Sequence, residues 1–180
     1  TRELTRWFGV ASLALLAVCY LGVMLAPDVS MHLATDAQEP ALAGNWRGSF
    51  GHKNVAAAVM AMLIFIGFYV VRAGDLMSGA LIIVLASVFL FFTAGKSSFA
   101  LCLGVLVLTS CATIVPWLWL RAVMLFAPLV LLNMLSIGTV MSDTLASIAG
   151  RLPLDTSFTG RTDIWTFGVQ TAQLKPWTGY

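Results

Sequence analysis

Three short segments of the sequence place basic side chains beside the small polar residues that begin helices. They are Gly44–Asn54 with Arg47, His52 and Lys53, Gly95–Ser98 with Lys96, and Phe158–Trp165 with Arg161. A helix N-terminus carries a partial positive charge, so a cation there is disfavoured by up to about 1 kcal/mol. Three such placements in one chain favour an anion held between them. A diphosphate suits N–H groups, Arg and Lys together.

Each segment also offers caps for the helix that it begins. Ser49 or Asn54 could cap the first helix, Ser97 or Ser98 the second, and Thr159 or Thr162 the third. The other N–H groups of each first turn would then point unsatisfied toward the loop. We predict that Arg47 and Arg161 act on the diphosphate directly. Lys96, Lys53, Asn54, His52 and Ser97 would complete the binding site.

The elements that must position these residues are strongly apolar. Of the 180 residues, 59% are hydrophobic and 10% charged, against about 25% charged in a soluble domain. The mean hydropathy is +0.92. A small soluble fold could not bury so much apolar surface, so we expect an integral membrane protein. The net charge of +2 is too small to indicate nucleic-acid binding.

Five runs of 17 to 20 residues contain no Asp, Glu, Lys, Arg or His: Trp7–Ala26, Val55–Val71, Met77–Ala94, Phe99–Val115 and Ala122–Gly138. About 20 helical residues cross a bilayer core of about 30 Å. Strand-like alternation is absent, which favours helices. The sequence therefore predicts an all-α bundle with five transmembrane helices within residues 1–138. Residues 139–180 would begin a large outer loop with an amphipathic helix near 162–174.

Five alternating spans sort the loops onto two faces. One face carries Arg2, Arg6, the Arg72–Asp75 link and the Pro116–Arg121 turn, and the other carries all three basic segments. Basic residues close to span ends favour the first face as cytoplasmic, whereas a simple count favours the second. We predict that the first face is cytoplasmic. The basic segments would then face the opposite compartment.

The three cysteines all lie within apolar runs and lack metal-ligand spacing, so we predict no metal and no cofactor. The chain does not start with Met and stops at Tyr180. We expect it to be a piece of a longer protein with further helices at both ends.

The basic segments also resemble motifs of the O-antigen ligase and polymerase family. The segments are Trp46-Arg-Gly-Ser-Phe-Gly-His-Lys-Asn54, Ala94-Gly-Lys-Ser-Ser98, and Gly160-Arg-Thr-Asp-Ile-Trp165 followed by Pro176-Trp-Thr-Gly179. They occur in the family's order over residues 40–180. The likeness is greatest to the exopolysaccharide-production polymerases.

This resemblance implies a bacterial inner-membrane glycosyltransferase that polymerises or ligates undecaprenyl-diphosphate-linked glycans on the periplasmic side. The implied partners are that donor, a glycan or lipid A-core acceptor, the bilayer and a chain-length regulator. Arg47, Lys96 and Arg161 match the family's cationic positions. The family's outer-loop histidine, a candidate general base, would lie beyond residue 180. The resemblance leaves open whether the chain is a ligase or a polymerase, and which sugar it uses.

Two other functions stay open from the residues alone. A transporter or flippase of lipid-linked oligosaccharides would share both the substrate and the membrane. Such proteins usually carry ionisable residues within their spans, and these five runs have none. A non-catalytic membrane scaffold would leave the three basic segments without a common role.

Overall fold

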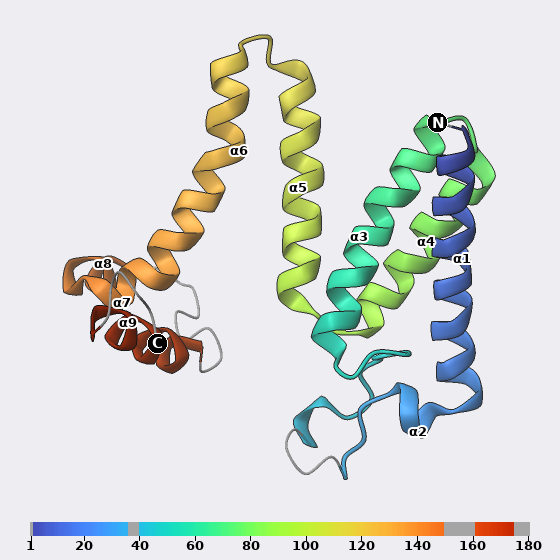
Figure 1. Cartoon of the computed structure of the whole chain (residues 1–180), viewed down its shortest axis with the longest axis horizontal. Coiled ribbons are helices and arrows are strands. Elements are labelled where there is room, and N and C mark those ends of the chain that lie inside the picture. Colours follow the sequence, from blue (N-terminus) through green and yellow to red (C-terminus); the bar gives the residue numbers. More distant parts are fainter. Residues whose placement is uncertain (1, 36–39, 150–160, 175–180) are drawn as a thin grey trace. The chain divides into compact units, whose positions relative to one another are not determined.

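The computed structural model describes residues 2–35, 40–149 and 161–174, and every regular element in these ranges is helical (Figure 1). The elements are α1 (Arg2–Leu25), α2 (Pro27–Ser30), η1 (Pro40–Leu42), α3 (Lys53–Arg72), α4 (Leu76–Phe92), α5 (Lys96–Ile114), α6 (Leu118–Asn133), η2 (Met134–Gly138), α7 (Thr139–Met141), α8 (Asp143–Ala149) and α9 (Arg161–Leu174). The prediction of an all-α chain is therefore confirmed for the described residues.

Three of these helices, α1, α3 and α5, are long and apolar enough to cross a membrane. The apolar parts of α4 (17 residues) and α6 are shorter. Each of the five predicted spans coincides with a helix, but only three reach the full crossing length. Length and composition thus support a membrane protein with three candidate spans.

The chain divides into two units, Thr1–Val107 and Leu108–Tyr180, and the division falls inside α5. The core of unit 1 forms where α1, α3 and α4 meet. Its fully buried side chains include Leu16, Met60, Ile82 and Phe89. In α5, Cys102 is the buried residue on the described part of the helix. The helix α5 therefore presents most of its apolar surface outward.

The helices α3 and α4 form the most closely packed pair of unit 1. A Cβ atom placed on Gly79 would lie 2.7 Å from the carbonyl oxygen of Gly67 and 2.7 Å from the backbone nitrogen of Val71. The two backbones therefore touch at this crossing. Glycine on both helices makes that approach possible, as is common where helices pack within membranes.

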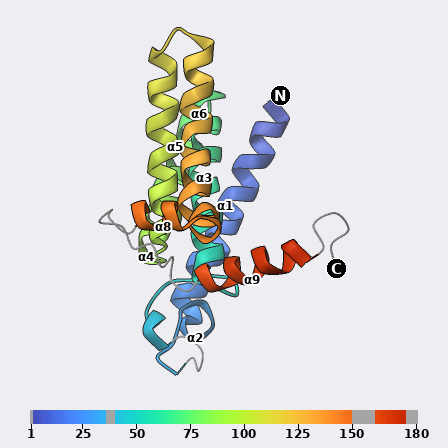
Figure 2. The ribbon, with the colours of Figure 1, turned by 90° about the vertical axis from the view of Figure 1, so that its left-hand side faces the viewer.

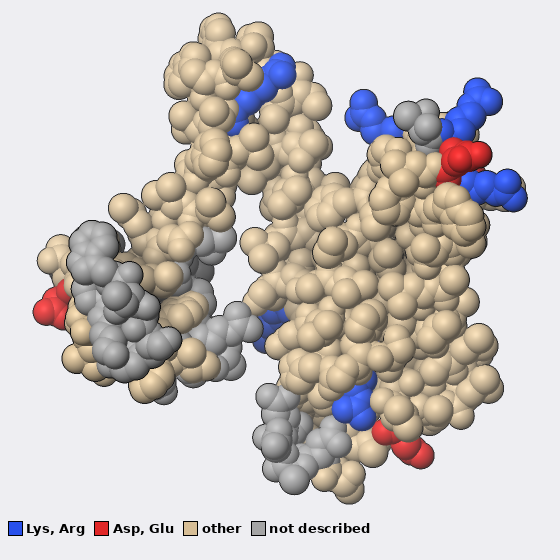
Figure 3. All heavy atoms as spheres, viewed as in Figure 1, with Lys and Arg blue, Asp and Glu red and all other residues tan. Residues whose placement is uncertain are grey.

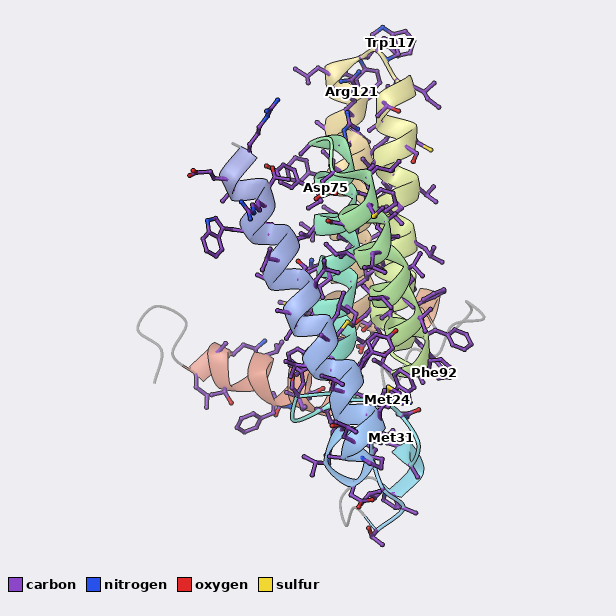
Figure 4. The ribbon with its side chains drawn as sticks, turned by 90° about the vertical axis from the view of Figure 1, so that its right-hand side faces the viewer. Met24, Met31, Asp75, Phe92, Trp117 and Arg121 are labelled. Carbon is purple, nitrogen blue, oxygen red and sulfur yellow. The ribbon has the colours of Figure 1, made fainter. Side chains whose placement is uncertain are left out.

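Unit 1 has two ends of different character, which we call the turn end and the loop end. The turn end is the short link Ala73–Asp75 between α3 and α4. The loop end consists of residues 26–52 and the 93–95 link between α4 and α5. Asp75 lies toward the first end, and Phe92 and Met31 toward the second (Figure 4). On the face of unit 1 seen in Figure 3, charged side chains gather toward the two ends.

Unit 2 contains the last part of α5, from Leu108 to Ile114, then α6 and the shorter helices. Residues 115–117 join α5 to α6, and Nε of Arg121 donates to the carbonyl of Val115 at 2.7 Å. The helix α6 begins at Leu118, within the segment that the sequence analysis assigned to a turn. It contains Pro128 and continues through five π-helical residues. The helix α9 contacts α7 and runs across the direction of α6 (Figure 2).

Candidate functional site

The loop end is built around a short antiparallel pairing of two loop segments. Met31 bridges Trp46, the N–H of His32 donates to Asn45 at 3.0 Å, and Gly44 donates back to His32 at 2.8 Å. The N–H groups of Arg47 and Gly48 both donate to Ser30, each at 2.9 Å. The basic segment 44–54 is therefore held against the exit from α2.

Trp46 fixes this loop to the end of α4. Its backbone N–H donates to the carbonyl of Phe92 at 3.1 Å, and its ring stacks on that of Phe92 with centroids 4.4 Å apart. The rings of Tyr20 and Phe89 meet the Trp46 ring edge-on. This aromatic cluster joins the segment that carries Arg47 to the helix that precedes Lys96.

The link between α4 and α5 lies against the start of α3. A Cβ on Gly95 would collide with the Cβ of Ala57, so these two residues are neighbours. Thr93 is fully buried and shapes the link, because its hydroxyl donates to Leu90 at 2.7 Å and accepts from Gly95 at 3.2 Å. Ala94 takes a positive φ of 50°. The starts of α3 and α5 are thereby brought to the same end of unit 1.

The start of α3 corrects our expectation of its cap residue. The cap is His52, whose Nδ1 accepts from the N–H of Asn54 at 3.1 Å, and neither Ser49 nor Asn54. The Ser49 hydroxyl instead lies 3.5 Å from the sulfur of Cys19. The N–H of Lys53 donates to Nε2 of His32 at 3.3 Å. The sequence analysis did not identify His32.

Of the four N–H groups that a helix start leaves unpaired, those of Lys53, Asn54 and Val55 are therefore occupied at α3. Val55 and Ala56 donate to the carbonyl of His52 at 3.1 and 3.2 Å, beyond the two amides bound by the imidazoles. A helix leaves four such groups unpaired unless caps satisfy them. We expected unsatisfied N–H groups here, and for these three amides that expectation is wrong. An anion at this position would meet side-chain cations and the helix dipole only.

The start of α5 is different. Lys96 donates its backbone N–H to Ala94 at 3.1 Å, and Phe99 donates to Gly95 at 3.0 Å. Within the described part of the chain, the backbone N–H groups of Ser97 and Ser98 meet no acceptor outside the helix. The helix starts at Lys96, three residues before the predicted span, so neither serine occupies the cap position. The side chains of Lys96 and Ser97 are exposed.

An open groove of about 570 Å³ runs beside this helix start. Its lining combines three aromatic rings with loop backbone and one cation: Ala43, Gly44, Asn45, Leu90, Phe91, Phe92, Ala94, Gly95, Lys96 and Phe99. Lys96 is thus the predicted site residue that lines the groove. The groove could receive a ligand that is apolar along part of its length and anionic near Lys96.

Arg47 lies at the same end but is otherwise engaged. Its Nε donates to the carbonyl of Val29 at 2.9 Å, and its side chain is partly buried. Neither Arg47 nor Lys53 belongs to the lining of the groove. The structure therefore gives Arg47 a role in holding the exit from α2. Its predicted contact with a diphosphate stays a prediction.

Arg161 is the first residue of α9 in unit 2. Thr162 follows it inside the helix, so Thr162 is not the cap, and Thr159 lies outside the described residues. Trp165 and Val169 are partly buried, whereas Ile164 is 68% exposed, so the apolar face of the predicted amphipathic helix is only partly covered. The pocket shared by Arg161, Arg47 and Lys96 remains a prediction.

No group of three or more His, Cys, Asp or Glu residues suited to a metal ion occurs in the described ranges. Comparisons with protein-family models, with curated proteins and with solved structures found no match. The residues and their geometry are therefore the basis of the functional argument.

Proposed function

We propose that this chain is part of a bacterial inner-membrane glycosyltransferase of the O-antigen ligase and polymerase type. It would transfer a glycan from undecaprenyl diphosphate to a glycan or lipid A-core acceptor on the periplasmic side. The observation that carries the proposal is the start of α5, where Lys96 lines an apolar groove. The backbone N–H groups of the next two residues, Ser97 and Ser98, meet no acceptor outside the helix among the described residues. An isoprenoid diphosphate has this same division between an apolar chain and an anionic head.

In the transfer reaction, the group that most needs electrostatic stabilisation is the leaving diphosphate. An acceptor hydroxyl attacks the anomeric carbon, the bond from that carbon to the diphosphate oxygen breaks, and the hydroxyl proton passes to a base. Negative charge grows on the departing oxygen. Fixed cations and N–H donors at a site with little water stabilise such charge, and each donor typically contributes about 3 kcal/mol. Lys96 would supply this stabilisation, with Arg47 and Arg161 as the other predicted cations.

The proposal is tested by polymer formation from lipid-linked repeat units with the full-length protein in proteoliposomes. Lys96→Ala is expected to lower the rate about 100-fold, and Lys96→Arg should retain most of it. Lys96 is exposed, so the substitution leaves the core intact. Arg72→Ala is the matched control, because Arg72 is an exposed cation at the turn end. Wild-type rates for Lys96→Ala would remove Lys96 from the mechanism.

Arg161 is tested in the same assay through Arg161→Lys and Arg161→Ala. Arg can bind two phosphate oxygens at once, so a lysine should restore only part of the activity. Equal, unchanged rates for both variants would exclude Arg161. If the wild-type protein instead moved lipid-linked units across the membrane without joining them, the transporter function would replace the enzyme. A protein with neither activity would favour the scaffold.

A further inference from the structure

The two histidines of the chain meet at the start of α3. His32 comes from the segment after α2 and His52 from the residue before α3, and their ring centroids are 5.2 Å apart. His32 is 5% exposed and His52 is partly buried. The rings accept from two successive backbone amides, Lys53 and Asn54. Two imidazoles therefore perform the capping that Ser, Thr, Asp or Asn usually performs.

His32 links three segments of the loop end. Its backbone pairs with Asn45 and Gly44, and its side chain accepts from Lys53. The segment between Asn45 and Lys53 carries Arg47, which is itself bound to the exit from α2. The bond to the His32 ring thus fixes where this basic segment meets α3.

Both caps require an uncharged ring. A neutral imidazole has one donor and one acceptor nitrogen, whereas the protonated ring has two donors. An accepting Nε2 on His32 places its proton on Nδ1, and an accepting Nδ1 on His52 places its proton on Nε2. Protonation of either ring would remove an acceptor and add a positive charge at the positive end of the helix dipole.

Several ionisable groups surround the two rings. The other ionisable groups on the segments that meet here are Cys19 and Tyr20 on α1, Asp28 on α2, Arg47, Lys53 and Lys96. Three of these are cations. Asp28, the carboxylate of this end within the described residues, is exposed, and Asp36 and Glu39 lie outside those residues. Imidazole is the side chain that ordinarily changes its charge between pH 5 and 8.

We propose that His32 and His52 form a proton-sensitive double cap that holds the Arg47 segment on the start of α3 only while both rings are neutral. His32 is then a positioning residue for this segment. The device makes the order of the loop end depend on the pH of the compartment that it faces. It stands independently of the proposed glycosyl transfer, because it needs no substrate.

Hydrogen–deuterium exchange of the full chain in nanodiscs tests the cap at pH 7.5 and pH 5.5. Rates are corrected for the chemical effect of pH on exchange. Peptides that span residues 49–58 should lose about tenfold in protection at pH 5.5, equal to about 1.4 kcal/mol. Peptides at the start of α4 are the internal control, because Asp75 caps that helix with a carboxylate. Equal protection of residues 49–58 at both pH values would overturn the proposal.

Two substitutions keep the acceptors but remove the titration. In His32→Gln the Oε1 atom can replace Nε2, and in His52→Asn the Oδ1 atom can replace Nδ1. The double variant should keep its protection at pH 5.5 within about twofold of that at pH 7.5. His32→Ala with His52→Ala should be unprotected at both. A Gln/Asn variant that loses protection as the wild type does would refute the role of the imidazoles.

Discussion

The two ends of unit 1 begin their helices by different means. At the turn end, α4 starts on Asp75, whose carboxylate accepts from the N–H of Ser78 at 3.1 Å, only three residues away in sequence. At the loop end, α3 starts on two imidazoles, and His32 is 21 residues from Lys53. The turn end is thus held by local contacts and by touching backbones. The loop end depends on side chains that come from distant segments.

The two ends of unit 1 are therefore expected to differ in how readily they change conformation. The Gly67–Gly79 crossing holds the start of α4 in close contact with α3. The Asp75 cap stays charged over the whole physiological range, because its pKa is lowered from 3.8. The loop end combines an open groove, three basic residues and two rings that lose their function on protonation. Changes of conformation and ligand contacts are therefore expected at the loop end, and the turn end serves as its fixed support.

The largest effect is expected from Gly79→Ala at the turn end. The added Cβ would meet backbone atoms of Gly67 and Val71 at 2.7 Å, and backbone cannot move aside as a flexible side chain can. We expect a loss of about 3 kcal/mol in stability, measured by unfolding in SDS and detergent mixtures. Gly104→Ala is the control, since nothing lies within 4 Å of its added Cβ. Equal stability of the two variants would contradict the close crossing.

A smaller effect is expected from Gly48→Ala at the loop end. Gly48 has a φ of +60°, and its added Cβ would lie 3.0 Å from the sulfur of Cys19 and 3.0 Å from the ring of Phe89. Backbone strain and crowding together should cost about 2 kcal/mol. Gly44→Ala separates the two, because Gly44 has a φ of +84° with open space around it. A greater loss at Gly44 than at Gly48 would show that the Gly48 contacts do not matter.

The smallest effect is expected from Asp75 and is visible as a pH dependence. Hydrogen bonds from the side chain and then the backbone of Ser78 lower the pKa of the Asp75 carboxyl from 3.8. A carboxyl whose pKa is lowered by folding contributes stability above its unfolded pKa and loses that contribution as pH falls through its folded pKa. Asp75→Ala should therefore lower Tm slightly at pH 7, and the difference in Tm from the wild type should shrink as the pH falls below 3.8.

The control is Asp75→Asn, which keeps a capping oxygen without the charge. Its Tm should lie between those of the wild type and the alanine variant. If protection at the start of α4 fell between pH 7.5 and 5.5 as is expected at α3, the contrast between the two ends would be lost.

The helices could be predicted from the sequence because their signal is local. Runs without charged residues coincide with α1, α3, α4, α5 and α6. Their exact starts were less accessible, since hydropathy records where a segment is apolar and not where its hydrogen bonds begin. At α5, for example, the apolar run begins at Phe99, but the helix already includes Lys96, Ser97 and Ser98. Asp75 shows the opposite case, in which a common cap residue lies directly before the helix.

The candidate site could be predicted only in part, because its geometry depends on contacts far apart in sequence. Lys96 was identified from its place at a helix start. The pairing of Met31 with Trp46 and the capping by His32 arise from the folding of the long loop, which carries no periodic pattern. One signal was present: the chain has only two histidines, and both lie between α1 and α3. Either histidine could therefore have been considered as a cap for the start of α3.

The Gly67–Gly79 crossing has a consequence for how the chain enters a membrane. At a rise of 1.5 Å per residue, the 17 residues of α4 extend about 25 Å, less than the hydrocarbon thickness of about 30 Å. With its backbone in contact with the longer α3, α4 can insert as one arm of a helical hairpin whose tip is the link Ala73–Asp75. Insertion together with α3 would then compensate for the short length of α4.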